Sequence, residues 1–171
     1  AGVIPADSWI QDREIGGGRI IGEVCHFIDY LSFVNGSMPV SVYAAALKDA
    51  QGLNDTVNIS LSFENGSIGN ISYFANGSKF LPKEYVEIHS MGATLALTDF
   101  RQLEVFTNRR DFKKKLISQD KGQKGAVAEF LEFVKKGSPP PISFEEIYTS
   151  SLASFKAVES LRTGKAIKIE E

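Results

Sequence analysis

The sequence predicts an α+β domain, in which helices pack on one face of an open, mainly antiparallel β-sheet. Near both ends of the chain, apolar residues recur at intervals of three and four, which is typical of amphipathic helices. Between these ends, short stretches alternate apolar with polar residues, which is typical of strands. The links between neighbouring strands are too short for crossovers, so we expect adjacent strands to be antiparallel.

The first helix is expected over residues 19–34, and Asn35-Gly36 provides a common way to end it. One stripe of this helix is apolar and consists of Val24, Phe27, Ile28, Leu31 and Val34. The opposite stripe is polar and consists of Glu23, His26, Asp29 and Tyr30. This polar stripe is the first candidate for a functional site.

Strands are expected over residues 40–47, 57–63 and 68–74, and Asn65-Gly66 predicts a two-residue hairpin turn. That turn would place Ser60 opposite Ile71, so the apolar residues would not all share one face. Either a bulge or a sheet with both faces partly covered resolves this conflict. The second option leaves one face for contact with another copy of the chain, and its candidate residues are Val57, Ile59, Leu61, Ile71 and Tyr73. Further strands are expected over residues 85–90, 94–98 and 102–106.

The end of the chain is expected to be helical over residues 125–136 and 144–162, followed by an edge strand over 166–169. Ser143 and Glu146 form a capping box for the last helix. We expect its inward residues to be Ile147, Leu152, Phe155, Val158 and Leu161. The sequence has no internal repeat and no visible boundary, so residues 1–171 are expected to form a single domain.

The composition excludes several functional classes. Nineteen basic and 21 acidic residues give a net charge of −2, and no basic face indicates nucleic acid. The apolar stretches are far shorter than the ~18 residues that cross a membrane. A single cysteine, Cys25, permits no internal disulfide, so a cytoplasmic protein is expected. Six Asn-x-Ser/Thr sequons are interpreted as residues of turns and of polar strand faces rather than as glycosylation sites, because no signal peptide is visible.

Three glycines, Gly16 to Gly18, precede the first helix, and glycines before a helix often bind phosphate. The dinucleotide fingerprint Gly-x-Gly-x-x-Gly is absent, because Ile21 stands where the third glycine is needed and no strand precedes the run. The chain therefore carries no nucleotide-binding fold of its own. Two roles for these glycines remain equally open: they form a flexible turn, or they line a ligand site.

The segment Glu23-x-x-His26-x-x-Asp29 places three ionisable side chains close together on the expected helix. A two-metal centre would need a second Glu-x-x-His, but Val86 stands three residues before His89, the only other histidine. We therefore expect no metal. Two interpretations of this segment remain. In the functional one, His26 acts as a general acid or base and Asp29 orients it. In the structural one, the three residues simply form a partly buried polar face of the helix.

The segment Gly16–Asp29 resembles the C-terminal domain of the glucose–fructose oxidoreductase/inositol dehydrogenase (Gfo/Idh/MocA) family. Four other segments agree with the resemblance: 83–87, 99–101, 120–122 and 159–164. The resemblance implies a two-domain enzyme, in which a Rossmann domain binds NAD or NADP and the domain seen here contacts the substrate. We expect that Rossmann domain to precede Ala1 and to be absent from this piece of the protein.

The resemblance also implies roles for individual residues. His26 matches the family histidine beside the nicotinamide, so we assign His26 and Asp29 to catalysis. Substrate contacts are assigned to Trp9, Arg19, Glu23 and Lys83, and cofactor contacts to Gly17 and Gly18. In inositol dehydrogenase-like members an aspartate stands four residues before the histidine, whereas Gly22 occupies that position here.

The sequence is thus identified as the substrate-binding domain of an NAD(P)-dependent oxidoreductase that acts on a hydroxyl or ketone of a sugar or cyclitol. Its expected partners are that small-molecule substrate, its own Rossmann domain and further copies of itself, bound through the sheet face. The alternative, kept open by Gly22, is a non-catalytic carbohydrate-binding or oligomerisation module. Alone, the fragment is expected to be inactive.

Overall fold

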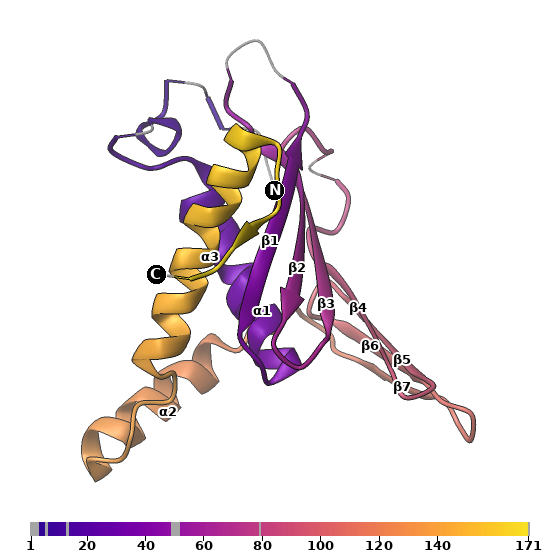
Figure 1. The fold of residues 1–171 in the computed structure, drawn as a ribbon. Coiled ribbons are helices and arrows are strands. Elements are labelled where there is room, and N and C mark those ends of the chain that lie inside the picture. The colour runs from indigo at the N-terminus through magenta and orange to yellow at the C-terminus, as the bar shows by residue number, and fades with distance from the viewer. Residues whose placement is uncertain (1–3, 6, 13, 49–51, 79, 171) are drawn as a thin grey trace. The chain divides into compact units, whose positions relative to one another are not determined.

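The computed structural model describes residues 4–5, 7–12, 14–48, 52–78 and 80–170 of the chain (Figure 1). The chain forms two compact units. The first unit comprises residues Ala1–Gly77 and Ile142–Glu171, and the second comprises residues Ser78–Pro141. The sequence alone gave no sign of this division and predicted one continuous sheet, whereas the described strands form two sheets of four strands each.

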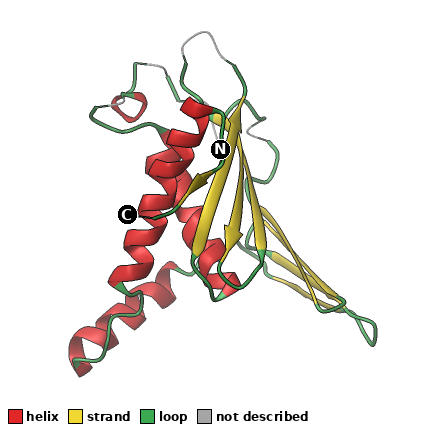
Figure 2. Ribbon diagram, viewed as in Figure 1, coloured by secondary structure: helices red, strands yellow, loops and turns green. Residues whose placement is uncertain are grey.

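The first unit is built on an antiparallel sheet in the order β3-β2-β1-β8. Its strands are β1 (Pro39–Ala46), β2 (Thr56–Phe63), β3 (Ile68–Phe74) and β8 (Ile167–Lys168). Helices α1 (Cys25–Asn35) and α3 (Phe144–Thr163) lie on the same face of this sheet (Figures 1 and 2). This confirms the predicted α+β class with helices on one face of an open antiparallel sheet.

The hairpin between β2 and β3 has a longer turn than the sequence predicted. The Phe63 N–H donates to Ser67 O at 3.0 Å, so three residues rather than two form the turn, with Gly66 at φ +84°. The register therefore shifts, and Ile59 lies opposite Ile71. Val57, Ile59, Leu61, Phe63, Ile71 and Tyr73 then share the buried face, whereas Ile68 and Phe74 lie on the other face.

The helix-covered face of this sheet forms the hydrophobic core. The core comprises Ile20, Val24, Ile28, Val42, Ala44, Val57, Ile59, Leu61, Phe63, Ile71, Tyr73, Ala75, Ala153 and Ala157. Five of these residues are the ones assigned from sequence to an open oligomer face, and that assignment is wrong. The uncovered face carries Ser and Asn side chains together with the exposed Val40, Tyr43, Ile68 and Phe74.

Helix α3 begins at the predicted capping box, where Ser143 Oγ accepts a hydrogen bond from the Glu146 N–H at 3.1 Å. Its buried residues are all small: Ser150, Ala153, Ser154, Ala157 and Ser160. Small side chains let the helix approach β1 closely, and Ser160 Oγ accepts a hydrogen bond from the Ala44 N–H at 3.0 Å. The predicted inward residues Ile147, Phe155 and Val158 are exposed instead. The expectation was therefore wrong for these three residues, whereas Leu161 does pack against the core.

The second unit contains an antiparallel sheet in the order β4-β5-β6-β7 and one helix. Its elements are β4 (Tyr85–Ser90), β5 (Ala93–Thr98), β6 (Gln102–Phe106), β7 (Phe112–Lys115) and α2 (Gln123–Lys136). Strand β7 was not expected, because the run Phe-Lys-Lys-Lys has no apolar alternation. Helix α2 has no buried residue, and its apolar residues Val127, Phe130, Leu131 and Val134 are exposed.

Candidate functional site

The helix that carries His26 does not begin as a regular α-helix. Residues Ile20–Val24 form a π-helical turn, labelled η2, which runs directly into α1 at Cys25. A π turn inserts one extra residue and so shifts the phase of the helix by about one residue, roughly 100°. Of the predicted polar stripe, Glu23 lies within the π turn, and His26 and Asp29 lie beyond it on α1.

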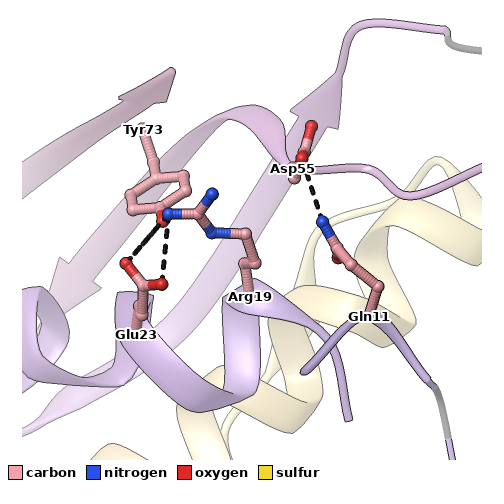
Figure 3. Close-up of polar contacts among 5 residues, drawn as sticks. All are labelled: Gln11, Arg19, Glu23, Asp55 and Tyr73. Atoms are coloured by element: carbon pink, nitrogen blue, oxygen red, sulfur yellow. Dashed lines mark hydrogen bonds and ion pairs between the residues drawn. The ribbon is translucent and has the colours of Figure 1, made fainter. Parts of the chain in front are cut away.

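A buried polar cluster joins this π turn to strand β3. Arg19 Nη2 lies 3.1 Å from both carboxylate oxygens of Glu23, and the Tyr73 hydroxyl donates to Glu23 Oε2 at 2.6 Å. The Arg19 guanidinium carbon also lies 5.1 Å from the centre of the Tyr73 ring. Figure 3 shows the three side chains converging. Arg19 is only 3% exposed and Tyr73 5%, whereas the Glu23 side chain is 40% exposed, so the cluster is buried on the Arg19 and Tyr73 side and reaches the surface at Glu23.

The cluster keeps Glu23 ionised. Burial alone would raise the pKa of Glu23, but hydrogen bonds from Tyr73 and Arg19 favour the carboxylate, so the pKa lies below its ordinary value. Burial and the bond to the Glu23 carboxylate both raise the pKa of Tyr73, which keeps the phenol protonated as a donor. Arg19 and Glu23 were predicted to contact substrate, but here each contacts the other.

His26 lies on the first turn of α1 with its side chain exposed, and Asp29 lies one turn further on and is half-buried. The two side chains form no hydrogen bond with each other in the part of the chain that the structure describes. The helix under them is fixed by Ile20, Val24 and Ile28, which are all in the core. The imidazole of His26 is thus accessible on the outer side of a helix whose other side is packed in the core.

Gly17 and Gly18 line a cavity of about 440 Å³ in the first unit. The other lining residues are Gln11, Arg19, Ile20, Ile21, Gly52, Leu53, Asn54, Val158, Leu161 and Arg162. Both glycines have positive φ, and a Cβ at Gly18 would meet no atom within 4 Å. The cavity has the size of a small-molecule site, about 300–1,000 Å³.

The amide groups of the glycine turn are already used inside the protein. The N–H groups of Gly16 and Gly17 both donate to Asp12 O at 2.9 Å, and that of Gly18 donates to Ile10 O at 3.1 Å. A phosphate-binding loop needs such N–H groups to point at the ligand. Gly17 and Gly18 can therefore shape a cavity wall, but they do not form a phosphate cradle.

The segment before the glycines carries two further residues of interest. Trp9 lies in the short 3-10 helix η1 (Trp9–Gln11) and is 65% exposed, so its ring is available for contacts. Gln11 is buried, and its Nε2 donates to Asp55 Oδ2 at 3.3 Å (Figure 3). Sequence reasoning missed Gln11 and the polar role of Tyr73. Only the general need of a buried tyrosine hydroxyl for a partner could have indicated the latter.

The remaining predicted site residue, Lys83, belongs to the second unit, where it is exposed just before β4. The structure therefore places the predicted residues in separate small groups. Gly17 and Gly18 share the cavity wall with Arg19, and His26 and Asp29 share α1.

Among the described residues, no three His, Cys, Asp or Glu side chains gather as a metal site requires. Burial raises the pKa of the Cys25 thiol, which disfavours the nucleophilic thiolate.

No helix in the described part of the chain is long and apolar enough to cross a membrane.

Comparison with known proteins gives a consistent result. A family model described as the GFO/IDH/MocA C-terminal domain matches residues 2–95. The uncharacterised protein y4oX of Sinorhizobium fredii is 27% identical over 185 residues, which cover 96% of this chain and 51% of that protein.

Two solved structures illustrate the fold. The aldose-aldose oxidoreductase from Caulobacter crescentus, complexed with glycerol, is 16% identical with a TM-score of 0.77, covering 98% of this chain and 52% of its own. A levoglucosan dehydrogenase, complexed with NADH and L-sorbose, is 18% identical with a TM-score of 0.78, covering 96% of this chain and 53% of its own. The chain thus spans about half the length of the relatives it matches.

Proposed function

The chain belongs to the GFO/IDH/MocA family through its C-terminal domain, and on that basis we propose that it is the substrate-binding half of an NAD(P)-dependent oxidoreductase. The reaction is hydride transfer at a hydroxyl or ketone of a sugar or cyclitol. The similar levoglucosan dehydrogenase, complexed with NADH and a sugar, supports both the cofactor and the substrate class. A nucleotide-binding domain outside this chain, as the family resemblance implies, would supply the other half of the site.

The observation that carries this proposal is the exposed imidazole of His26 on a helix whose opposite side is fixed in the core. Oxidation of a carbinol releases a proton from its hydroxyl and a hydride from its carbon. The neutral imidazole takes the hydroxyl proton as the carbonyl forms, and the imidazolium returns it in the reverse direction.

Other residues of the chain orient the His26 imidazole or bind the substrate. Asp29, one turn beyond His26, orients the imidazole and stabilises its charged form. Trp9 offers an exposed ring against which the C–H face of a sugar packs. Arg19 and Glu23 act through the cluster with Tyr73, because they hold the π turn that leads to His26. Lys83 is proposed to bind polyol hydroxyls from the second unit.

The residues of this chain would form only part of the cofactor-binding site. Gly17 and Gly18 border a cavity large enough for a ring, and Ile20, Ile21 and Leu161 give it apolar walls. These residues would contact the nicotinamide end, whereas the occupied N–H groups of the glycine turn leave pyrophosphate binding to the other domain. When bound, a nicotinamide cofactor would supply the hydride-transfer chemistry. Both NAD and NADP are compatible with this chain.

We further propose that copies of the chain associate through the uncovered face of the β3-β2-β1-β8 sheet. Val40, Tyr43, Ile68 and Phe74 are exposed there, among Ser and Asn side chains. Exposed apolar side chains on an otherwise polar sheet face favour packing against the same face of a second copy of the chain. The residues that take part differ from those chosen from sequence, because the latter form the core.

The proposed activity is tested on the full-length protein that contains this chain, with NAD or NADP and a panel of aldoses, ketoses and cyclitols. We expect absorbance change at the reduced nicotinamide band with at least one substrate, and none with this chain alone. A full-length protein that binds sugars but reduces neither cofactor would support the non-catalytic alternative instead.

A further inference from the structure

The 9–18 loop, which leads from Trp9 to the π turn before His26, folds back on itself. The hydrogen bonds from its three glycine N–H groups hold its end against residues 10–12. Asp12 closes the turn between them, because its Oδ1 accepts hydrogen bonds from the N–H groups two and three residues later, at 2.8 and 2.9 Å. The described residues of the loop therefore form a folded element rather than an open connection.

Gly16 packs directly against the backbone of Trp9 and Ile10. A Cβ at Gly16 would overlap Trp9 O, and it would lie 2.7 Å from Ile10 Cα and 2.8 Å from Ile10 O. All three atoms belong to the backbone, which cannot rotate away as the end of a flexible side chain can. The neighbouring glycines differ, because a Cβ at Gly18 or Gly22 would meet no atom within 4 Å. Any side chain at position 16 must therefore displace the segment that carries Trp9.

The 9–18 loop is also anchored to the body of the first unit. Gln11 is buried, and its Nε2 donates to Asp55 Oδ2, just before β2. At the other end of the loop, Gly18 O accepts a hydrogen bond from the Gly22 N–H at 3.0 Å, which joins the loop to the π turn. The backbone of Trp9 is therefore connected to the start of α1 through a series of defined contacts.

The large side chain at the start of this loop is that of Trp9, whose ring is exposed. An aromatic ring contributes most to binding when its place is fixed beforehand, because a group that must be ordered on binding costs conformational entropy. An exposed ring takes its place mainly from the backbone that carries it. The contact between Gly16 and that backbone is therefore the feature that can fix Trp9.

We propose that Gly16 is a positioning residue for the substrate: because it has no side chain, the 9–18 loop can close and hold the Trp9 ring at a fixed place relative to α1. The proposal rests on the proposed function, in which Trp9 packs on the sugar and His26 takes the hydroxyl proton. Gly16 itself touches neither the substrate nor the cofactor. Its role is separate from that of Gly17 and Gly18, which border the cavity.

The structural step is tested by the fluorescence of Trp9, the single tryptophan of the chain. Gly16→Ala is expected to change the emission maximum of Trp9 and its quenching by acrylamide, because the added methyl group displaces the Trp9 backbone. Gly125→Ala in α2 is the matched control, since its Cβ meets no atom within 4 Å, and it should leave both quantities unchanged. An unchanged emission and quenching in Gly16→Ala would overturn the proposal.

The functional step is tested by steady-state kinetics of the full-length protein with a sugar or cyclitol substrate. Gly16→Ala is expected to raise KM for that substrate about tenfold, the scale of one lost aromatic contact, and to change KM for the cofactor far less. In a double-mutant cycle, Gly16→Ala should have little further effect in a Trp9→Ala background, because it acts through Trp9. Effects of the two substitutions that add in full would overturn the proposal.

A second variant keeps the test decisive if Gly16→Ala does not fold. Asp12→Ala removes the acceptor that closes the turn of the loop, and Asp12 is exposed, so we expect this variant to fold and to raise the substrate KM. Asp12→Asn keeps an acceptor oxygen and should restore the wild-type KM. Equal KM values for Asp12→Ala and the wild type would overturn the proposal.

Failure of the proposed function is distinguishable from failure of the positioning role. If the full-length protein reduces neither cofactor, the proposed function fails, and the effect of Gly16 on the substrate fails with it. The emission of Trp9 in the chain alone still decides whether Gly16 fixes the 9–18 loop.

Discussion

Arg19 and Glu23 form an ion pair across the π-helical turn that precedes His26, with Arg19 Nη2 3.1 Å from Glu23 Oε1. Tyr73 joins the pair from β3 at 2.6 Å, and its ring also lies 6.4 Å from that of Phe27, the neighbour of His26. The sheet thus contacts the helix on both sides of His26 along the chain. This gives the exposed imidazole a fixed support.

The hydroxyl of Tyr73 is expected to stabilise the fold. Tyr73→Phe removes the donor to Glu23 but leaves the ring in the core, so we expect a loss of about 1–2 kcal/mol in the free energy of unfolding. Urea unfolding of the chain measures this loss. Tyr43→Phe is the matched control, because Tyr43 is exposed on the opposite face of the same sheet. Equal stabilities for the two variants would contradict a structural role of the cluster.

The same cluster predicts a pH dependence of stability. The pKa of Glu23 is lowered in the folded protein from its ordinary value near 4.5. A lowered folded-state pKa gives stability that is complete above pH 4.5 and is lost as the pH falls through the folded-state value. We therefore expect the melting temperature of Glu23→Gln to lie below that of the wild type at neutral pH. The difference should narrow below pH 4.5, and a gap of constant size down to pH 2–3 would contradict the assignment.

The broad fold follows from sequence because burial requires regular patterns. The alternation in 57–63 and 68–74 predicted two strands, and the Ser143–Glu146 capping box predicted where α3 begins. The π turn was beyond such patterns, since it depends on burying Ile20, Val24 and Ile28 together against the sheet. The predicted apolar stripe is nevertheless buried at Val24 and Ile28, and Glu23, His26 and Asp29 all lie outside the core.

The inward face of α3 was also beyond sequence patterns. Hydrophobic periodicity assigns the large residues to the core, but Ala153 and Ala157 are buried there because β1 and α1 approach the helix closely. A single chain does not reveal such a close approach. Pairing between distant segments, such as Gln11 with Asp55 or Glu84 with Lys121, is likewise decided by the tertiary structure.

One glycine substitution tests the packing of the first unit. A Cβ at Gly69 would lie 2.9 Å from Leu31 Cδ1 and 3.3 Å from Phe63 Cε2, so the end of the half-buried Leu31 side chain must shift, and Gly69→Ala is expected to cost about 1 kcal/mol. Gly125→Ala in the exposed helix α2 meets no atom within 4 Å and is expected to stabilise by up to about 1 kcal/mol. Thermal unfolding of both variants gives the comparison. A neutral Gly69→Ala would contradict the packing of α1 on the sheet.

Association is predicted through the uncovered face of the first sheet. We expect light scattering to give the mass of a dimer or larger assembly, consistent with an interface that buries more than ~1,000 Å² in total. Phe74→Glu introduces a charge on this face and is expected to produce monomers. Phe130→Glu, on the exposed face of α2, serves as the control and should leave the mass unchanged. A monomeric wild-type protein at high concentration would contradict the proposal.

The central claim is that His26 handles the proton of the reacting hydroxyl, and steady-state kinetics of His26→Ala in the full-length enzyme test it most directly. We expect kcat to fall by ~10²-fold or more, because a positioned base contributes 10²–10⁴-fold to such a step. Cofactor affinity and melting temperature should stay near wild type, since the side chain is exposed and lies outside the core. An unchanged kcat on the natural substrate would contradict the claim and leave α1 with a purely structural role.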